Sequence, residues 1–166
     1  MLPAVLAVIT VVLGGLAAWF GAEASSLSTP ATQNAALTDP AATNTVSRQV
    51  SSAINALFSY DYAFPGPTTQ AARRLLTGQA IAQYASLFGQ VQREAPRQKL
   101  IVTTTVTDTG VEMLDGAHAR VLVFAVESDR RAAGGQPATA GAMLGVNAIL
   151  QGTTWKISGI DTFSAP

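Results

Sequence analysis

The periodicity of apolar residues changes at Lys99, and this change limits the fold more than any other feature. Before Lys99, apolar residues recur three and four positions apart, as Val46, Val50, Ile54 and Leu57 do, which is typical of an amphipathic helix. After Lys99, the stretch KLIVTTTVTD alternates with a period of two and is rich in β-branched residues, which indicates a strand. Helices followed by strands predict an α+β fold.

Three helices and four to five strands are expected. The first helix begins at Asp39-Pro40 and ends at 62–64, before Pro65-Gly66-Pro67. The second begins at Thr68 or Thr69 and ends at Leu76, and the third stops before Pro96, because proline cannot continue a helix. The strands form a curled, mostly antiparallel sheet with the helices on one face, and they are expected at 99–108, 111–114, 117–127, 138–151 and 154–163.

The segment from Leu2 to Ala22 contains no charged residue and is long enough, at about 30 Å as a helix, to cross a bilayer. We therefore expect a transmembrane helix at 1–22, a linker at 23–38 and an exported domain at 39–166. This makes the chain a single-pass protein of the inner membrane with its C-terminal domain on the periplasmic side. The alternative is a signal peptide cleaved at Ala22-Glu23-Ala24, although the apolar run exceeds the usual h-region of about 7–15 residues.

One face of the expected membrane helix carries small residues at four-residue spacing. Rows of small residues let two helix backbones approach closely in lipid. The candidates for contact with another membrane helix are Gly14, Ala18 and Ala22, with Gly15 and Gly21 beside them. The alternative is that glycine and alanine are simply common in membrane helices.

The strand expected at 117–127 is apolar on both of its faces, so both should be covered. Helices can cover only one of them. The other face should therefore line a cavity or contact another protein. The candidates for this second role are Val121, Val123, Leu144 and Val146.

The composition excludes several kinds of chemistry. Ten basic residues balance ten acidic ones, so no basic surface for nucleic acid is expected, and zero cysteines with one histidine exclude the common zinc sites. His118 has no nucleophile motif near it and is expected at an exposed hairpin. Asp161 could be a base in an apolar pocket or a solvated or paired carboxylate, and Tyr60 and Tyr62 could polarise a ligand or lock a helix end. We expect no catalytic site, metal or cofactor.

The chain resembles the actinobacterial Mce-associated membrane proteins, whose exported domain is similar to the NTF2-like and VirB8-like folds. The resemblance rests on the order of the elements and on five stretches: VSSAINALFSYDY (50–62), AARRLLTGQAIAQYASLFGQV (71–91), QKLIVTTTVTDTGVEML (98–114), ARVLVFAV (119–126) and WKISGIDTF (155–163). It implies a non-catalytic accessory subunit that stabilises or regulates an Mce-type ABC importer of fatty acids or sterols.

The implied partners are the permease and Mce subunits of such an importer, contacted by the membrane helix, with contacts of the exported domain to these subunits or to lipid left open. Two alternatives remain. The domain could be an NTF2-like lipid-binding or isomerase-type protein that uses Asp161 with Tyr60 or Tyr62. It could also be a VirB8-like scaffold of a secretion complex that acts through self-association.

Overall fold

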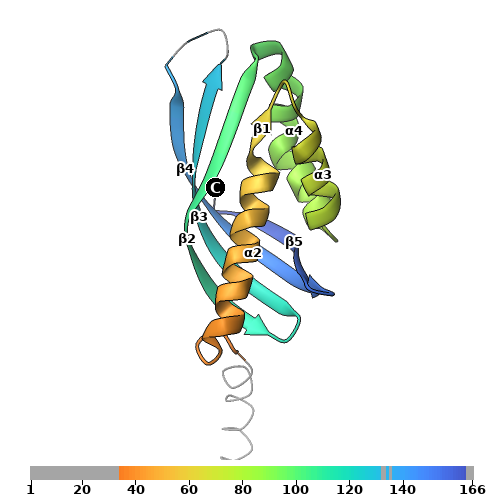
Figure 1. The fold of residues 1–166 in the computed structure, drawn as a ribbon, viewed down its shortest axis with the longest axis vertical. Helices are drawn as coiled ribbons and strands as arrows, with labels where there is room; N and C mark the ends of the chain where they lie inside the picture. Colours follow the sequence, from red (N-terminus) through yellow and green to blue (C-terminus); the bar gives the residue numbers. More distant parts are fainter. Residues whose placement is uncertain (1–33, 132–133, 135, 164–166) are drawn as a thin grey trace, which may run out of the picture. The chain divides into compact units, whose positions relative to one another are not determined.

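The computed structural model describes residues 34–131, 134 and 136–163. They form three helices and five strands in the order α2, β1, α3, α4, β2, β3, β4 and β5 (Figure 1). This confirms the expected α+β class. The expected membrane segment 1–22 lies outside the described residues, with its candidates Gly14, Gly15, Ala18, Gly21 and Ala22. Within the described part, no helix is both long and apolar enough to cross a membrane.

The first described helix, α2 (Pro40–Phe58), begins where the sequence predicts it. The Asp39 side chain accepts a hydrogen bond from the backbone N–H of Ala42 at 2.9 Å, and Pro40 occupies the first helical position. Its apolar side is buried against the sheet at Val46, Val50, Ala53, Ile54 and Leu57. The chain already packs before Asp39, since the N–H of Ala35 bonds to the carbonyl of Leu114 at 2.7 Å.

Two prolines behave differently from the prediction. Helix α3 (Gly66–Leu75) begins at the Pro65-Gly66-Pro67 segment, because proline in a first turn lacks only an N–H that would have no helical partner. Thr68 does not cap this helix; its hydroxyl donates to the Ser59 carbonyl at 2.6 Å. Helix α4 (Ala80–Gln98) contains Pro96 in its last turn, where a lost hydrogen bond is only a local cost, and it ends at Lys99.

The strands form one antiparallel sheet in the order β1-β2-β3-β4-β5. Their bounds are Tyr60–Asp61, Leu100–Asp115, His118–Arg131, Ala138–Gln151 and Thr154–Thr162. The two strands predicted between residues 99 and 114 are one strand, β2, interrupted by register shifts at 106–108 and 111–113. The predicted turn at Asp115-Gly116 joins β2 to β3, and Gly116 has a φ of 53°, which glycine adopts without strain.

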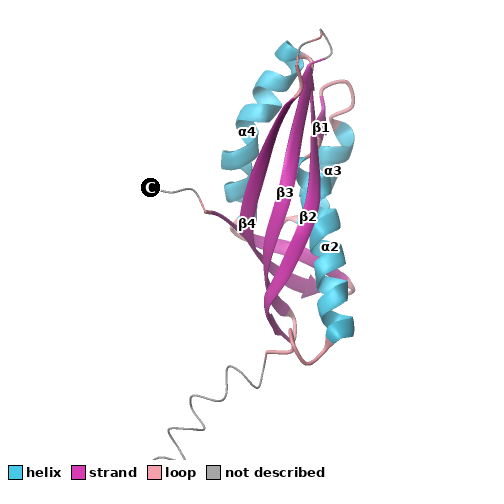
Figure 2. Cartoon of the chain, turned by 90° about the vertical axis from the view of Figure 1, so that its left-hand side faces the viewer, coloured by secondary structure: helices cyan, strands magenta, loops and turns pink. Residues whose placement is uncertain are grey.

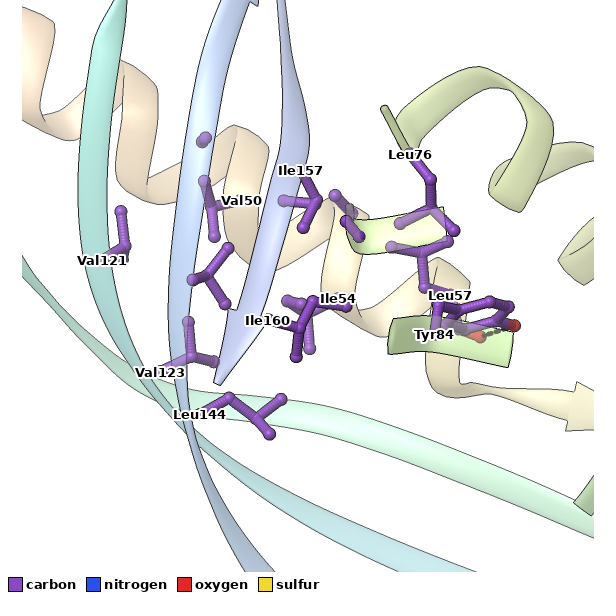
Figure 3. Packing of buried hydrophobic residues seen from close by; sticks show 14 of the residues in the cluster. Val50, Ile54, Leu57, Leu76, Tyr84, Val121, Val123, Leu144, Ile157 and Ile160 are labelled. Carbon is purple, nitrogen blue, oxygen red and sulfur yellow. Dashed lines mark hydrogen bonds between the residues drawn. The ribbon is translucent and has the colours of Figure 1, made fainter. Parts of the chain in front are cut away.

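The helices cover one face of the curled sheet (Figures 1 and 2). The buried core residues fill the space between the helices and the sheet. Ile54 and Leu57 of α2 pack there among Ile157, Ile160 and buried residues of β3 and β4 (Figure 3). Four of these β3 and β4 residues are the ones predicted to line a cavity or meet a partner: Val121, Val123, Leu144 and Val146. All four are buried under the helices, so the expected assignment of the two faces is reversed.

Candidate protein-interaction surface

The uncovered face of the sheet carries large apolar side chains from β3 and β4. Phe124 and Val126 of β3 are 40% and 37% exposed, and Met143 of β4 is 41% exposed. Phe124 pairs with Met143 across the two strands, and Val126 pairs with Gly141. Directly opposed side chains in a sheet lie close enough to contact each other. We call the residues Phe124, Val126 and Met143 the outer patch.

The outer patch continues toward the end of β5. Gly145 of β4 lies on the same face as Met143, and a Cβ placed on Gly145 would meet the ring of Phe163 at 3.3 Å. The Phe163 side chain therefore lies over the Gly145 backbone, and it is itself 51% exposed. An apolar area with a polar border is typical of a protein-binding surface.

The polar border of the outer patch is formed by an ionic cluster around Arg120. Its Nε donates to Oε2 of Glu112 at 3.0 Å, and its Nη1 donates to Oδ2 of Asp161 at 3.3 Å. The same Nη1 donates to Oδ1 of Asn147 at 3.1 Å. These side chains are partly exposed, so the cluster adds little stability, but it fixes the charge pattern beside the patch.

Asp161 is thus a paired carboxylate on the outer face, one of the two alternatives left open by the sequence. The side chain of Asp161 points outward because the register between β4 and β5 shifts near Gly159. The shift places the neighbouring Ile160 in the core. Tyr60 lies on β1, at the opposite end of the strand order. The structure therefore does not bring the candidate base together with the candidate tyrosines.

The tyrosines of the Phe58–Tyr62 segment support packing. Tyr60 is buried and its ring lies 6.2 Å from that of Phe88, while Tyr62 is half-buried. His118 is exposed at the start of β3, as expected. In the part of the chain that the structure describes, no group of three or more histidine, cysteine or acidic residues could hold a metal ion.

A surface cleft of about 560 Å³ lies between α3 and α4. Tyr60, Leu76 and Tyr84 form its inner wall, and Ile81, which is 57% exposed, and Arg73 also line it. The space between the helices and the sheet is filled by the core side chains.

The outer patch was missed by the sequence analysis because both residue rows of β3 are apolar. One signal in the sequence distinguishes them. The row with Leu122, Phe124 and Val126 begins with Arg120, whereas the row with Val121 and Val123 contains no charged residue from 119 to 125. A charged residue among the alternate residues of one strand face indicates that this face is exposed to solvent.

No protein-family model and no curated protein matches the chain. Several solved structures share its fold. An IcmL-like type IV secretion system protein from Legionella pneumophila matches with a TM-score of 0.61 and 11% identity, over 73% of this chain and 93% of that one. The periplasmic domain of DotI matches with a TM-score of 0.60 and 17% identity, over 72% and 94%. CagV, a VirB8 homolog from Helicobacter pylori, matches with a TM-score of 0.58 and 11% identity, over 71% and 95%.

These matches define the class of fold. The described domain has the NTF2-like, VirB8-like architecture of domains from type IV secretion proteins, as the resemblance of the sequence implied. At 11% to 17% identity, the likeness establishes the fold alone. The more specific resemblance to Mce-associated proteins stays a prediction.

Proposed function

We propose that this chain is a non-catalytic assembly component of a protein complex in the cell envelope. Its N-terminal helix anchors it in the inner membrane, and its domain lies on the periplasmic side and binds partner proteins. The observation that carries the proposal is the outer patch, in which three large apolar side chains from adjacent strands stay exposed side by side.

The choice of a protein partner rests on the form of this surface. The outer patch lies on a sheet face, whereas a site for a small ligand is a concave pocket that encloses most of its ligand. Burying Phe124 and Met143 against another protein would remove them from water, at a gain of about 25 cal/mol for each Å² of apolar surface. The ionic border around Arg120 would help to orient the partner.

Two kinds of complex fit the proposal. The similarity in fold to secretion-system proteins favours a VirB8-like scaffold. The resemblance of the sequence to Mce-associated proteins leaves an accessory subunit of a lipid importer as the second candidate. Both predict protein partners, and the identity of those partners separates them.

The experiment is affinity purification of the tagged full-length chain from its native membranes in mild detergent, followed by mass spectrometry. The wild type is compared with Phe124→Asp, which places a charge in the outer patch. The control is Leu87→Asp on α4, because Leu87 is 41% exposed and Phe124 is 40% exposed.

We expect a fixed set of proteins to co-purify with the wild type and with Leu87→Asp, and to be lost with Phe124→Asp. Secretion proteins in that set would identify the scaffold, and a permease with an ATPase would identify the importer subunit. A wild-type chain that emerges alone contradicts the proposal. Equal recovery of partners with Phe124→Asp excludes the outer patch as their binding site.

A further inference from the structure

The cleft between α3 and α4 is a concave site on the helix-covered side of the sheet, away from the outer patch. The two helices lie next to each other there (Figure 1), and the facing side of each forms one wall. Ala72, Arg73 and Leu76 belong to the α3 wall, and Ile81, Tyr84 and Ala85 belong to the α4 wall. The volume of about 560 Å³ falls within the range of about 300–1,000 Å³ that is typical of small-ligand pockets.

The α4 wall leaves an apolar side chain in contact with water. Ile81 is 57% exposed, although it lies on the same face of α4 as the buried Tyr84. A ligand that covered Ile81 would remove its apolar surface from water, at a gain of about 25 cal/mol for each Å². The part of a ligand that contacts this wall is therefore apolar.

The base of the cleft is fixed before any ligand binds. The hydroxyl of Tyr84 donates a hydrogen bond to the carbonyl of Leu57 at 2.6 Å (Figure 3), and its ring stacks on that of Phe88 at 5.4 Å. Leu76 is buried and its backbone forms a bridge with Ile157 of β5. A preformed base lowers the cost of ordering side chains when a ligand binds.

Tyr60 of β1 brings a polar group without a partner to this cleft. Its side chain is 7% exposed, and its ring packs against Phe88 of α4. Among the described residues, the Tyr60 hydroxyl makes no hydrogen bond. No fully buried side-chain oxygen or nitrogen of these residues lacks a partner, so this hydroxyl is accessible from outside the core. A tyrosine this buried usually has a partner for its hydroxyl, and a ligand can supply one.

Arg73 gives the cleft a single positive charge. No other residue that lines the cleft is charged at neutral pH. Among the described residues, no carboxylate pairs with Arg73. A guanidinium can donate two parallel hydrogen bonds to the two oxygens of a carboxylate. It also balances the one charge of that group, whereas a phosphate monoester carries nearly two.

We propose that the cleft between α3 and α4 binds an apolar molecule that carries one carboxylate. The carboxylate pairs with Arg73, the apolar part covers Ile81, and the Tyr60 hydroxyl supplies a further hydrogen bond. A cationic ligand would meet Arg73 with no acidic residue on the walls to balance it. Fatty acids and aromatic acids share this chemistry. The site is independent of the proposed function, since it uses no residue of the outer patch.

The test is photo-labelling of the full-length chain in lipid nanodiscs with a decanoate that carries a diazirine on its chain. Mass spectrometry measures the label in the peptides of α3 and α4, with and without decanoate, decanol or naphthoate as competitor. Ala85→Trp fills the cleft from an exposed position, and the matched control is Ala82→Trp, which is also exposed on α4 but does not line the cleft. Arg73→Gln removes the charge, and its control is Arg74→Gln, which lines a different hollow.

We expect the label in α3 and α4 to fall several-fold in Ala85→Trp and in Arg73→Gln, and to stay at the wild-type level in both controls. Decanoate should compete several-fold better than decanol, which has the same chain without the charge. Equal competition by naphthoate would support apolar carboxylates as a class, and competition by decanoate alone would support fatty acids.

Three results would count against the proposal. Equal labelling of Ala85→Trp and Ala82→Trp would overturn the cleft as the binding site. Equal labelling of Arg73→Gln and Arg74→Gln, or equal competition by decanol and decanoate, would overturn the recognition of a carboxylate. A wild-type chain without label in α3 and α4 would overturn the proposal as a whole.

Discussion

Tyr84 joins α4 to the end of α2 through a single buried hydroxyl. Its oxygen donates a hydrogen bond to the carbonyl of Leu57 at 2.6 Å, and its ring contacts Phe58 and Phe88. Burial raises the pKa of Tyr84 well above its ordinary value of 10.0, because the phenolate would lose its hydration. The hydroxyl therefore stays protonated in the folded protein under conditions in which the unfolded chain ionises.

Replacing Tyr84 by phenylalanine should lower the free energy of unfolding at neutral pH by about 1–2 kcal/mol, because a buried carbonyl loses its donor. The pH dependence has a definite sign. Since the folded pKa is raised, the wild type should lose stability as the pH rises above 10.0, and Tyr84→Phe should lose less over the same range. Urea unfolding between pH 8 and 11 measures both effects. If the free energy of unfolding fell equally with pH in the wild type and in Tyr84→Phe, this account would be contradicted.

Glu127 of β3 is a second residue whose ionisation should affect stability. Burial, and then the charge of Asp129, raise the pKa of its carboxyl. A raised folded pKa means that ionised Glu127 destabilises the fold once the pH rises above the ordinary value of 4.5. Glu127→Gln should therefore raise the melting temperature at pH 7, with the gain shrinking toward pH 4. Glu94→Gln, at a partly exposed position of α4, is the control. An unchanged or lower melting temperature for Glu127→Gln at pH 7 would contradict the prediction.

At the level of the elements, the helices stabilise the sheet through amide side chains as well as through apolar contacts. Gln49 of α2 accepts a bond from the N–H of Trp155 at 2.9 Å, and Asn55 and Gln83 do the same for strands β2 and β5. Each bond gives a partner to a strand N–H that no neighbouring strand reaches. Removing one leaves a polar backbone group without a partner, which costs about 1–3 kcal/mol where it is buried.

Asn55→Leu should therefore destabilise the domain by about 1–3 kcal/mol and speed hydrogen exchange of the Val106 amide. Asn55→Asp keeps an oxygen acceptor in the same place and should preserve most of the protection. Residue-resolved hydrogen exchange by NMR measures this directly. If the Val106 amide exchanged as slowly in Asn55→Leu as in the wild type, its hydrogen bond to Asn55 would not be what protects it.

The elements themselves were predictable because their signals are local. The cap at Asp39, the switch at Lys99 and the turn at Asp115-Gly116 each depend on a few neighbouring residues, and all three appear in the structure. The sequence pattern predicts two strands at 99–108 and 111–114, whereas the structure has one continuous strand, β2. Asp108 and Gly110 lie beside shifts of register within it, which depend on the pairing with β3.

The assignment of the two sheet faces was not predictable from the same local signals. Val121 and Phe124 are equally apolar, so the choice between them depends on which side α2 packs against. That choice depends on contacts between elements far apart in the chain, which single-sequence patterns do not determine.

For the molecule as a whole, the α+β class and the resemblance to the NTF2-like and VirB8-like folds were predictable, and the similarity to DotI and CagV confirms them. Asp161 and Tyr60 lie on strands at opposite ends of the sheet, so these two candidate residues are not brought together. The proposed function depends on what contacts the outer patch.

The most direct measurement is photo-cross-linking in living cells, with a photoactivatable amino acid at position 124 of the full-length chain. The control position is 87, which is similarly exposed on α4. The account predicts covalent adducts with specific proteins at position 124 and few or none at position 87. If position 124 gave no protein adduct, or the same adducts as position 87, the outer patch would not be a partner-binding surface and the central claim would be wrong.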